Sequence, residues 1–480
     1  MSFVPRVNVE GTWTSNVRPQ AGGVGASGSD FVMSVQPGFR FTADGDRLKA
    51  YADYSFRRLF YASHSSLNRN QNSLNAFGSY ELAENFAFID FNGRMSQDTI
   101  SAFGSLADDG VSINNNRTET RMYRVSPYVR GWFGDWANYQ ARYARTMYRA
   151  KSVGTADYDL DEYSLLLNSG SQLRAFSWTL DTSRQTQDYI VGRGYESSRI
   201  RLFLTYLFTP QLSVSLIPGW ESNNYASQEN DKQSDVTMGG RVQWAISNRT
   251  NVSALLEKRV FGNAHAISFE HRTPRTAWRF SDTRDASATP GQNTSFSMGP
   301  LYDLLFYQFA SVEPDPVLRA QLVESYLAQT GEDGSRNVDL SLLTSAMTLN
   351  RRQNLSFTLL GLRDSLTFMA SRQETSRLLQ IGAGGDLGSS NFVRQHGFSV
   401  AYSRRLTPLT SFNVVASQSR SSGENTRMQR SELRSLDVGL STRLSKDTTA
   451  TVGVRRILSD TAAASSYTES SVRGGLSMRF

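Results

Sequence analysis

Cysteine is absent from this chain of 480 residues. Its absence excludes a disulfide framework and any chemistry that needs a thiolate. The four histidines, at positions 64, 265, 271 and 396, include no His-Glu-x-x-His or His-x-His pair, so no zinc site is predicted. No Ser, His and Asp arrangement indicates a nucleophile with its base, and no glycine-rich loop joins a strand to a helix. We therefore expect no enzyme, no metal and no cofactor.

Long apolar runs are also missing. No stretch approaches the roughly 18–20 apolar residues that a transmembrane helix needs. Hydrophobic residues make up 39% of the chain and charged residues only 20%. Such a chain is too polar for a large soluble core, yet its 27 Phe and 20 Tyr make it too aromatic for disorder. Its length alone would suggest about three domains, but no linker rich in Pro or Ser divides it.

Lysine is rare, so most of the positive charge is carried by arginine. Of 51 Lys and Arg residues only five are Lys, so arginine carries most of the positive charge behind the formal net value of +7. Arginine is favoured where a guanidinium must be packed or aimed at a carboxylate or phosphate. The charge alone would allow a nucleic-acid binder, but the arginines are spread along the chain and form no tail or stripe. We expect no nucleic-acid partner.

A signal peptide is not visible either. The start, Met1–Pro5, lacks a basic region followed by an apolar run. The chain is then either cytoplasmic or a mature chain that carries a start Met. The periodicity described next favours a mature chain in the bacterial outer membrane.

The strongest pattern in the sequence has a period of two. Near the C-terminus, Val472, Leu476, Met478 and Phe480 alternate with polar residues such as Arg473. Side chains on a strand alternate between two faces, so the pattern indicates one apolar and one polar face. Such runs extend over about 10 residues or more, the length of a transmembrane β-strand. Other examples are 199–208, 236–246, 437–444 and 449–455.

Connections between these runs alternate in length. Short turns contain Gly, Pro, Asn or Asp, and longer polar loops lie between them, which is typical of an outer-membrane barrel with short periplasmic turns. Aromatic residues near the turns, among them Trp132, Phe133 and Trp136, predict a girdle at the membrane boundary. A soluble array of β-sandwiches is the alternative, but its strands would be shorter and it would need linkers. The turns are 42–46, 82–85, 133–136, 208–211, 247–250, 406–409 and 444–447; the loops are 18–30, 63–72, 98–118, 151–162, 185–195, 221–233 and 419–431.

The predicted fold is all-β and transmembrane: one large antiparallel outer-membrane β-barrel over residues 1–480, with about 22 strands and a range of 18 to 24. An even number places both termini at the periplasmic rim. A TonB-dependent receptor has a similar strand number but needs an N-terminal plug domain, and strands begin here by about Arg6. The last strand resembles the signal that barrels present to their insertion machinery, which assigns this role to Val472, Leu476, Met478 and Phe480.

One segment, residues 285–342, breaks the strand pattern. Asp315-Pro316 is typical of a helix start and Gly331 of a helix end. Apolar residues between them recur at helical spacing. We expect a helical insertion that serves as an extracellular lid or a lumen plug, with a self-packed surface loop as the alternative. The predicted gate residues are Leu301, Leu305, Phe309, Leu318, Leu322 and Tyr326.

Arginines recur on the polar faces of the strands. A lipid-facing Arg at mid-depth would cost about 2–4 kcal/mol, so we expect these side chains to point into the lumen. Two interpretations remain open: cross-strand ladders with carboxylates that brace the barrel, or an electropositive path for an anionic solute. The residues are Arg142, Arg199, Arg201, Arg241, Arg259, Arg405, Arg443, Arg455, Arg473 and Arg479.

Several segments carry a family resemblance: Gly22-Gly23, Pro37-Gly38-Phe39, the hairpin 271–278, Pro314-Asp315-Pro316 and the terminal Arg479-Phe480. With them, the chain resembles outer-membrane proteins associated with the PEP-CTERM/exosortase and exopolysaccharide loci of proteobacteria. The resemblance implies a role in polysaccharide secretion, similar to that of the alginate-export porin. The implied partners are a polysaccharide substrate, outer-membrane lipid or lipopolysaccharide, periplasmic export subunits and the barrel-insertion machinery.

Three functional hypotheses follow. The first is a channel that exports an anionic exopolysaccharide through an Arg-rich lumen. The second is a general diffusion porin or an uptake channel for small solutes. The third is a non-conducting scaffold barrel of a secretion complex.

Overall fold

The structure is a computed structural model of the whole chain. It describes residues 1–17, 28–105, 111–113, 115–151, 157–170, 175–190, 193–225, 231–287, 305–306, 319, 323, 344, 347–378, 385–425, 428–462 and 466–480.

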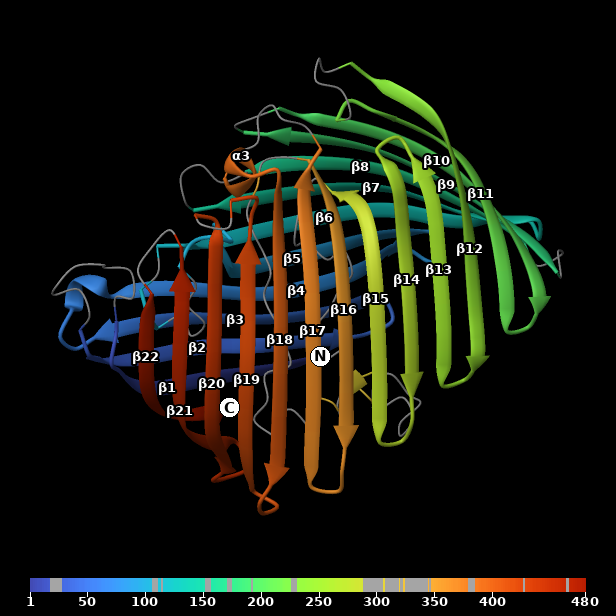
Figure 1. Cartoon of the computed structure of the whole chain (residues 1–480). Helices are drawn as coiled ribbons and strands as arrows, with labels where there is room; N and C mark the ends of the chain where they lie inside the picture. Colours follow the sequence, from blue (N-terminus) through green and yellow to red (C-terminus); the bar gives the residue numbers. More distant parts are fainter. Residues whose placement is uncertain are drawn as a thin grey trace.

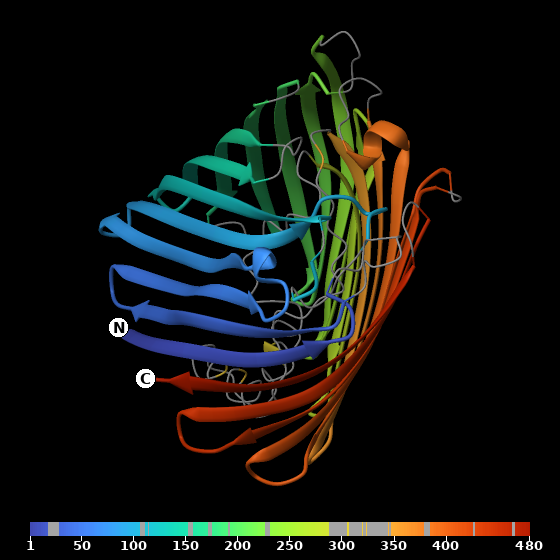
Figure 2. The ribbon, with the colours of Figure 1, turned by 90° about the vertical axis from the view of Figure 1, so that its left-hand side faces the viewer.

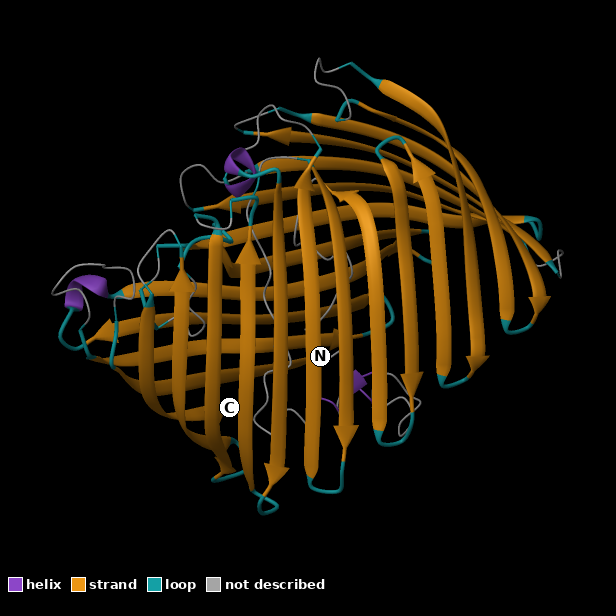
Figure 3. Ribbon diagram, in the orientation of Figure 1, coloured by secondary structure: helices purple, strands orange, loops and turns teal. Residues whose placement is uncertain are grey.

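Long strands dominate the described chain, as Figure 3 shows. Short helical turns, η1 (Ser65–Leu67) and α3 (Asp386–Ser389), lie in two of the connections. The strands are β1 (Ser2–Thr14), β2 (Asp30–Asp44), β3 (Leu48–Tyr61), β4 (Arg69–Ala83), β5 (Ala87–Thr99), β6 (Arg117–Phe133), β7 (Ala137–Ala150), β8 (Tyr158–Ser169), β9 (Phe176–Tyr189), β10 (Tyr195–Thr209), β11 (Leu212–Asn223), β12 (Gln233–Ser247), β13 (Thr250–Arg259), β14 (Gly262–Arg272), β15 (Thr276–Ser287), β16 (Thr348–Leu360), β17 (Asp364–Arg377), β18 (Phe392–Arg405), β19 (Thr410–Ser422), β20 (Arg430–Arg443), β21 (Thr448–Thr461) and β22 (Tyr467–Arg479).

The sheet closes on itself. Every strand pairs antiparallel with its neighbours in sequence, and β1 pairs with β22 as well as with β2. In that closing pair Val9 lies opposite Leu476 and Trp13 opposite Val472. Figures 1 and 2 show the resulting barrel from two sides. The predicted fold class, a single large antiparallel β-barrel of about 22 strands, is therefore confirmed.

The two ends of the barrel differ in their connections. At the end that holds both termini, the connections have only two to six residues; we call this the short-turn end. The opposite, long-loop end carries all the connections longer than six residues, although β13 and β14 are joined there by only two residues, 260–261. This asymmetry is typical of outer-membrane barrels, whose short turns are periplasmic. The termini lie side by side in Figure 2, and the Phe480 amide donates to the Pro5 carbonyl at 2.9 Å.

The two faces of the sheet also differ. The outer face carries large exposed hydrophobic side chains, while the side chains between them are polar and mostly buried or half-buried. In β22, for example, Val472 is 49% exposed whereas its neighbour Ser471 is buried. Trp132, Phe133 and Trp136 are exposed at the short-turn end, where the aromatic girdle was predicted. The barrel thus presents an apolar wall outside and a polar wall to its lumen.

The predicted insertion begins slightly later than its sequence pattern indicates. Residues 285–287 still belong to β15, because Asp285 lies opposite Asn350 and Ser287 opposite Thr348 in the ladder to β16. The connection therefore runs from 288 to 347. Among the described residues, no helix has the length and apolar character needed to cross a membrane.

Candidate functional site: the lumen wall

All ten predicted arginines lie on the inward face of their strands. Their positions alternate with exposed apolar residues, and they share a face with buried polar residues such as Ser403 and Ser441. Side chains on a strand alternate between its two faces, so the spacing from the apolar residues was enough to predict that these arginines point inward. Their role in transport stays a prediction.

Five of these arginines form ion pairs with carboxylates of other strands, most of them two strands away. Nη1 of Arg142 lies 2.7 Å from Oδ2 of Asp90. On the other side of the lumen, Asp437 accepts a hydrogen bond from Arg473 at 2.7 Å, and its Oδ2 lies 3.2 Å from Nε of Arg455. These three pairs fix the guanidinium groups in place and join strands up to two positions apart in the sheet. The remaining paired members are Arg201, with Asp181 at 2.5 Å and Glu257 at 3.7 Å, and Arg259.

Arg259 is the most buried of the ten. Its Nε and Nη2 donate to the two carboxylate oxygens of Glu221 at 2.9 and 2.8 Å, and Nη1 reaches Asp285. The Tyr225 hydroxyl donates to the same carboxylate at 2.6 Å. The Glu221 side chain is fully buried and that of Arg259 is 6% exposed. A bidentate, fully hydrogen-bonded pair of this kind is rigid and holds β11, β13 and β15 together.

Arg199 and Arg241 differ from these. Among the described residues, no carboxylate oxygen lies within 4.0 Å of either guanidinium group. Arg199 stands opposite Glu221 in the ladder, but Arg259 and Tyr225 occupy that carboxylate. Arg241 lies over the Phe203 ring, 5.1 Å from its centre. The wall formed by β9–β13 therefore holds two half-buried cations that are not neutralised by a paired acid.

Arg405, Arg443 and Arg479 lie at the short-turn end of the lumen. Arg405 donates to the Leu362 carbonyl of the neighbouring turn, while Arg443 and Arg479 are exposed. The inward face thus carries positive charge at its mid-height and again at its periplasmic rim.

The opposite wall of the lumen carries less charge; between the strand ends its inward charged side chains are Arg352, which donates to Gln373 at 2.7 Å, and Asp437. The inward residues of β16–β20 between the strand ends are mostly Ser, Thr, Asn and Gln, and many bond to one another. Thr358 and Thr367 hydroxyls are 3.1 Å apart, and Ser417 and Ser435 hydroxyls 2.7 Å apart. Figure 1 shows these strands across the barrel from β6–β11. This hydroxyl wall was missed by the sequence analysis, although the alternate serines 417, 419 and 421 carry its signal.

A connection crosses the long-loop end of the barrel. We call it the mouth loop, residues 100–116 between β5 and β6, of which 100–105, 111–113 and 115–116 are described. The Ser101 hydroxyl and the Ala102 amide each donate to the Asp386 carboxylate at 2.6 Å. Leu387, fully buried beside them, belongs to a small apolar cluster at this contact. Burial raises the pKa of the Asp386 carboxyl, against the hydrogen bonds from Ser101 and Ala102, which favour its charged form.

The mouth loop is also tied to the first and last strands. The Ser112 hydroxyl donates to Glu469 of β22 at 2.7 Å, and the Ile113 amide donates to the Val17 carbonyl at 3.0 Å. The Tyr61 hydroxyl donates to the carbonyl of Val111 at 2.5 Å. Since β5 and α3 lie far apart around the barrel, the loop spans part of its mouth. The sequence indicated only a long polar loop here, because contacts between distant segments leave no periodic signal.

Five buried tyrosines line the long-loop end of β7–β11. Their rings contact in series, with centres 5.1 Å apart for Tyr148 and Tyr158 and 5.8 Å apart for Tyr189 and Tyr195. Met347, at the end of the β15–β16 connection, packs against this group, and its amide donates to the Tyr195 hydroxyl at 3.4 Å. The connection is therefore anchored to the inner wall just before β16 begins. Tyr225 completes the set.

Most of the predicted gate falls outside the described residues: this applies to Leu301, Phe309, Leu318, Leu322 and Tyr326. Leu305 is described, is helical and is 1% exposed. The Arg319 guanidinium lies over the Phe306 ring, 4.8 Å from its centre. The gate stays a prediction. Within the described residues, no group of three His, Asp or Glu side chains is arranged to hold a metal ion.

The predicted assembly residues occupy the position that their role requires. Val472, Leu476 and Met478 lie on the outer face of β22 and are exposed, and Phe480 follows the strand directly. Recognition by the insertion machinery stays a prediction.

Comparison with known proteins bears on the fold. No protein-family profile and no curated protein matches this chain. Among solved structures, it is similar to the ferric-catecholate import receptor Fiu of Escherichia coli K12, with a TM-score of 0.50 and 8% identity over 99% of this chain and 81% of the receptor. It also aligns with the siderophore receptor PirA of Acinetobacter baumannii, with a TM-score of 0.49 and 8% identity over 99% of this chain and 80% of the receptor. For OccAB3 of the same species, the TM-score is 0.36 and the identity is 8% over 100% of this chain and 99% of OccAB3.

These likenesses concern architecture alone. The closed barrel with an apolar outer face has the fold of outer-membrane proteins of Gram-negative bacteria. At 8% identity, the likeness to Fiu carries no information about cargo or partners.

Proposed function

We propose that this chain forms an outer-membrane channel that exports an anionic exopolysaccharide through its lumen. The observation that carries the proposal is the pair Arg199 and Arg241, two inward cations without a carboxylate within ion-pair distance in the described wall. Ion-paired neighbours such as Arg201 and Arg259 hold this wall rigid. Unmatched positive charge in a narrow, polar passage lowers the barrier for an anion.

The facing hydroxyl wall completes the proposed path. Sugar hydroxyl groups can exchange hydrogen bonds with the Ser, Thr and Gln side chains of β16–β20 as the polymer advances. Many weak and equivalent contacts suit conduction, because a transported chain must leave each position as readily as it enters. The family resemblance supports a polysaccharide as the substrate and periplasmic export subunits as partners. A role as transporter rather than enzyme agrees with the barrel architecture.

A channel for small solutes is the second candidate. The observation that favours it is the mouth loop, held across part of the opening by Asp386 and Glu469. A narrowed mouth would admit small anions and exclude a polymer. A non-conducting scaffold would instead require a lumen closed along its whole length.

Secretion measurements with charge variants test the proposal. Cells that lack the chain and are complemented with Arg199→Gln/Arg241→Gln should export less polymer, by about tenfold if the two charges contribute ~1.4 kcal/mol to its passage. The matched comparison is Arg405→Gln/Arg443→Gln, which removes two inward charges from the rim and should lower export less than the Arg199/Arg241 variant does. Equal export by both variants would contradict the assigned path. If cells that lack the chain export normal amounts of polymer, the proposal that the chain transports the polymer is wrong.

A further inference from the structure

Six arginines near the long-loop end of β17–β21 point away from the lumen. In β18, Val393 and Gln395 are buried on the inner face, so Arg394 and His396 lie on the outer face with Phe398, which is 47% exposed. The same parity places the other outward arginines beside exposed apolar residues. Lipid-facing arginine was not expected, and it is tolerated only near the membrane surface. The six are Arg372, Arg394, Arg420, Arg430, Arg434 and Arg456.

This outer group carries more positive than negative charge. Glu374 lies 3.0 Å from Arg394 and 3.9 Å from Arg372, and so serves two guanidinium groups. Glu432 is likewise shared by Arg430 and Arg434, at 3.1 and 2.5 Å. Among the described residues, Arg420 and Arg456 have no carboxylate within 4.0 Å. Near the long-loop ends of β17–β21, Asp460 is the remaining acid on the outer face of the described strands.

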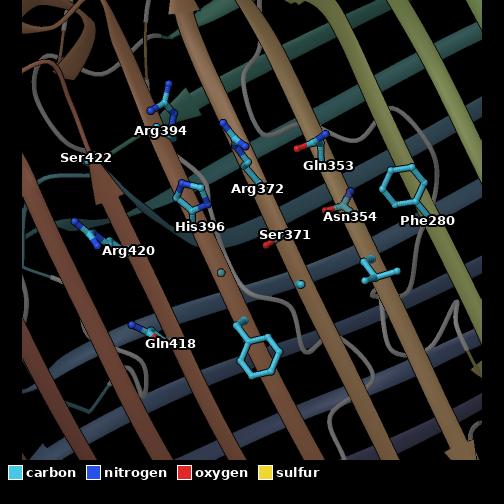
Figure 4. Close-up of a pocket in the computed structure, with 14 residues that line it drawn as sticks. Phe280, Gln353, Asn354, Ser371, Arg372, Arg394, His396, Gln418, Arg420 and Ser422 are labelled. Atoms are coloured by element: carbon cyan, nitrogen blue, oxygen red, sulfur yellow. The ribbon is translucent and has the colours of Figure 1, made fainter.

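Three of these arginines, Arg372, Arg394 and Arg420, border an open hollow of about 710 Å³ on the outer wall. Arg372 of β17, His396 of β18 and Arg420 of β19 lie directly opposite one another across the three strands. Figure 4 shows these side chains and Arg394 grouped at one end of the hollow. Adjacent strands are ~4.8 Å apart, so the long side chains can reach a common anion.

The other end of the hollow is apolar. Leu355 and Phe398, 44% and 47% exposed, line it nearer the short-turn end than the arginines do. Basic groups near the extracellular surface thus continue into apolar groups deeper along the wall. This layout matches a lipid with an anionic head group and acyl chains, and it does not match a free small anion.

We propose that this hollow binds a phosphorylated glycolipid of the outer leaflet. Its phosphate lies among Arg372, Arg394 and Arg420, and an acyl chain runs over Phe398 and Leu355. Guanidinium groups bind phosphate oxygens through paired, charge-assisted hydrogen bonds, which is the recognition that a surplus of Arg over Lys favours. The site lies outside the lumen and is independent of what the channel conducts.

A second outer wall provides a matched control. Arg121, Arg145 and Arg149 of β6 and β7 also point outward, beside exposed residues such as Met147 and Val125. Each pairs with a carboxylate, Glu119 at 2.6 Å, Asp161 at 3.2 Å and Asp159 at 2.8 Å respectively; Glu119 also lies 3.6 Å from Lys151 and Asp159 3.4 Å from Arg145. These three arginines match in number the three that border the hollow, and each of them is paired with a carboxylate.

Binding of lipid A to the purified full chain in detergent, followed by native mass spectrometry, tests the site. We expect one tightly bound lipid A, and at least about tenfold weaker binding by Arg372→Gln/Arg394→Gln/Arg420→Gln, because three charge-assisted contacts are lost. The triple variant Arg121→Gln/Arg145→Gln/Arg149→Gln should bind like the wild type. Heat-dependent mobility in detergent gels verifies that every variant is a folded barrel.

The ligand arms separate phosphate recognition from general lipid coating. Dephosphorylated lipid A should bind about as weakly as lipid A binds the first triple variant, and inorganic phosphate alone should not compete at equal concentration. Equal binding by both triple variants, or equal binding of dephosphorylated lipid A, would overturn the proposal. Competition by inorganic phosphate would also overturn it, since the site would then recognise a free anion.

Discussion

Arginine occupies three different environments in this wall. Arg259 is clamped by carboxylates, Arg142 lies 4.0 Å from the centre of the Tyr128 ring while paired with Asp90, and Arg199 is unpaired. The planar guanidinium suits all three environments, because it packs on aromatic rings and can also donate two parallel hydrogen bonds to one carboxylate. A lysine would supply only the charge. The scarcity of lysine noted in the sequence therefore reflects packing within the wall as much as its charge.

Breaking the Arg259–Glu221 pair from one side should destabilise the barrel strongly. In Arg259→Gln the fully buried Glu221 keeps only the Tyr225 hydroxyl and a weak amide contact from Asn223. Loss of one partner of a buried pair costs about 3–5 kcal/mol. Urea unfolding in lipid vesicles should show this loss, with Arg405→Gln at the rim as the unaffected control. Adding Glu221→Gln should recover part of it; a single variant as stable as the control would refute the assigned role.

Strand parity alone identified the face of each lumen arginine, but it did not reveal its partner. Arg473 was placed inward from its neighbours Val472 and Gly474, and it lies there. Its pairing with Asp437, two strands away, depends on register, which no local pattern specifies. The outward arginines show the other limit, because Arg394 shares its outer face with Phe398 and outward arginines were not predicted from the sequence.

At the scale of elements, strands and connections differ in how much the sequence predicts. The alternating pattern and the turn residues located β22 and the short-turn ends of β20 and β21 to within a few residues, whereas the long-loop ends of β20 and β21 extend beyond the predicted runs. The mouth loop shows the reverse case. Its polar residues indicated a loop, but the bonds from Ser101 and Ala102 to Asp386 join positions that lie 284 or more residues apart. Such contacts depend on the closed barrel and exist only after it forms.

The β15–β16 connection can be tested as a gate. Ser287 and Thr348 lie opposite each other in the ladder, so residues 288–347 can be replaced by a two-residue Asn-Gly turn. If this connection obstructs the lumen, the shortened chain should show a larger single-channel conductance in planar bilayers. A shortened chain with a folded barrel, unchanged conductance and unchanged polymer export would identify the connection as a surface loop.

At the scale of the whole molecule, closure explains the composition. One face of each strand meets lipid and the other meets water or polar groups, so a chain with only 39% hydrophobic residues needs no ordinary core. The pairing of β22 with β1 leaves no exposed edge and makes all 22 strands one unit. Fold class and approximate strand number followed from period and length. The cargo did not, because it depends on the balance of paired and unpaired charge along the inner wall.

The selectivity of the purified full chain in a planar bilayer tests the central claim most directly. Under a potassium chloride gradient, the unmatched charge of Arg199 and Arg241 predicts anion selectivity, with a reversal potential displaced toward the chloride equilibrium value. A reversal potential displaced toward the potassium value would contradict the account. So would the absence of any conductance in both the full chain and the chain with residues 288–347 replaced.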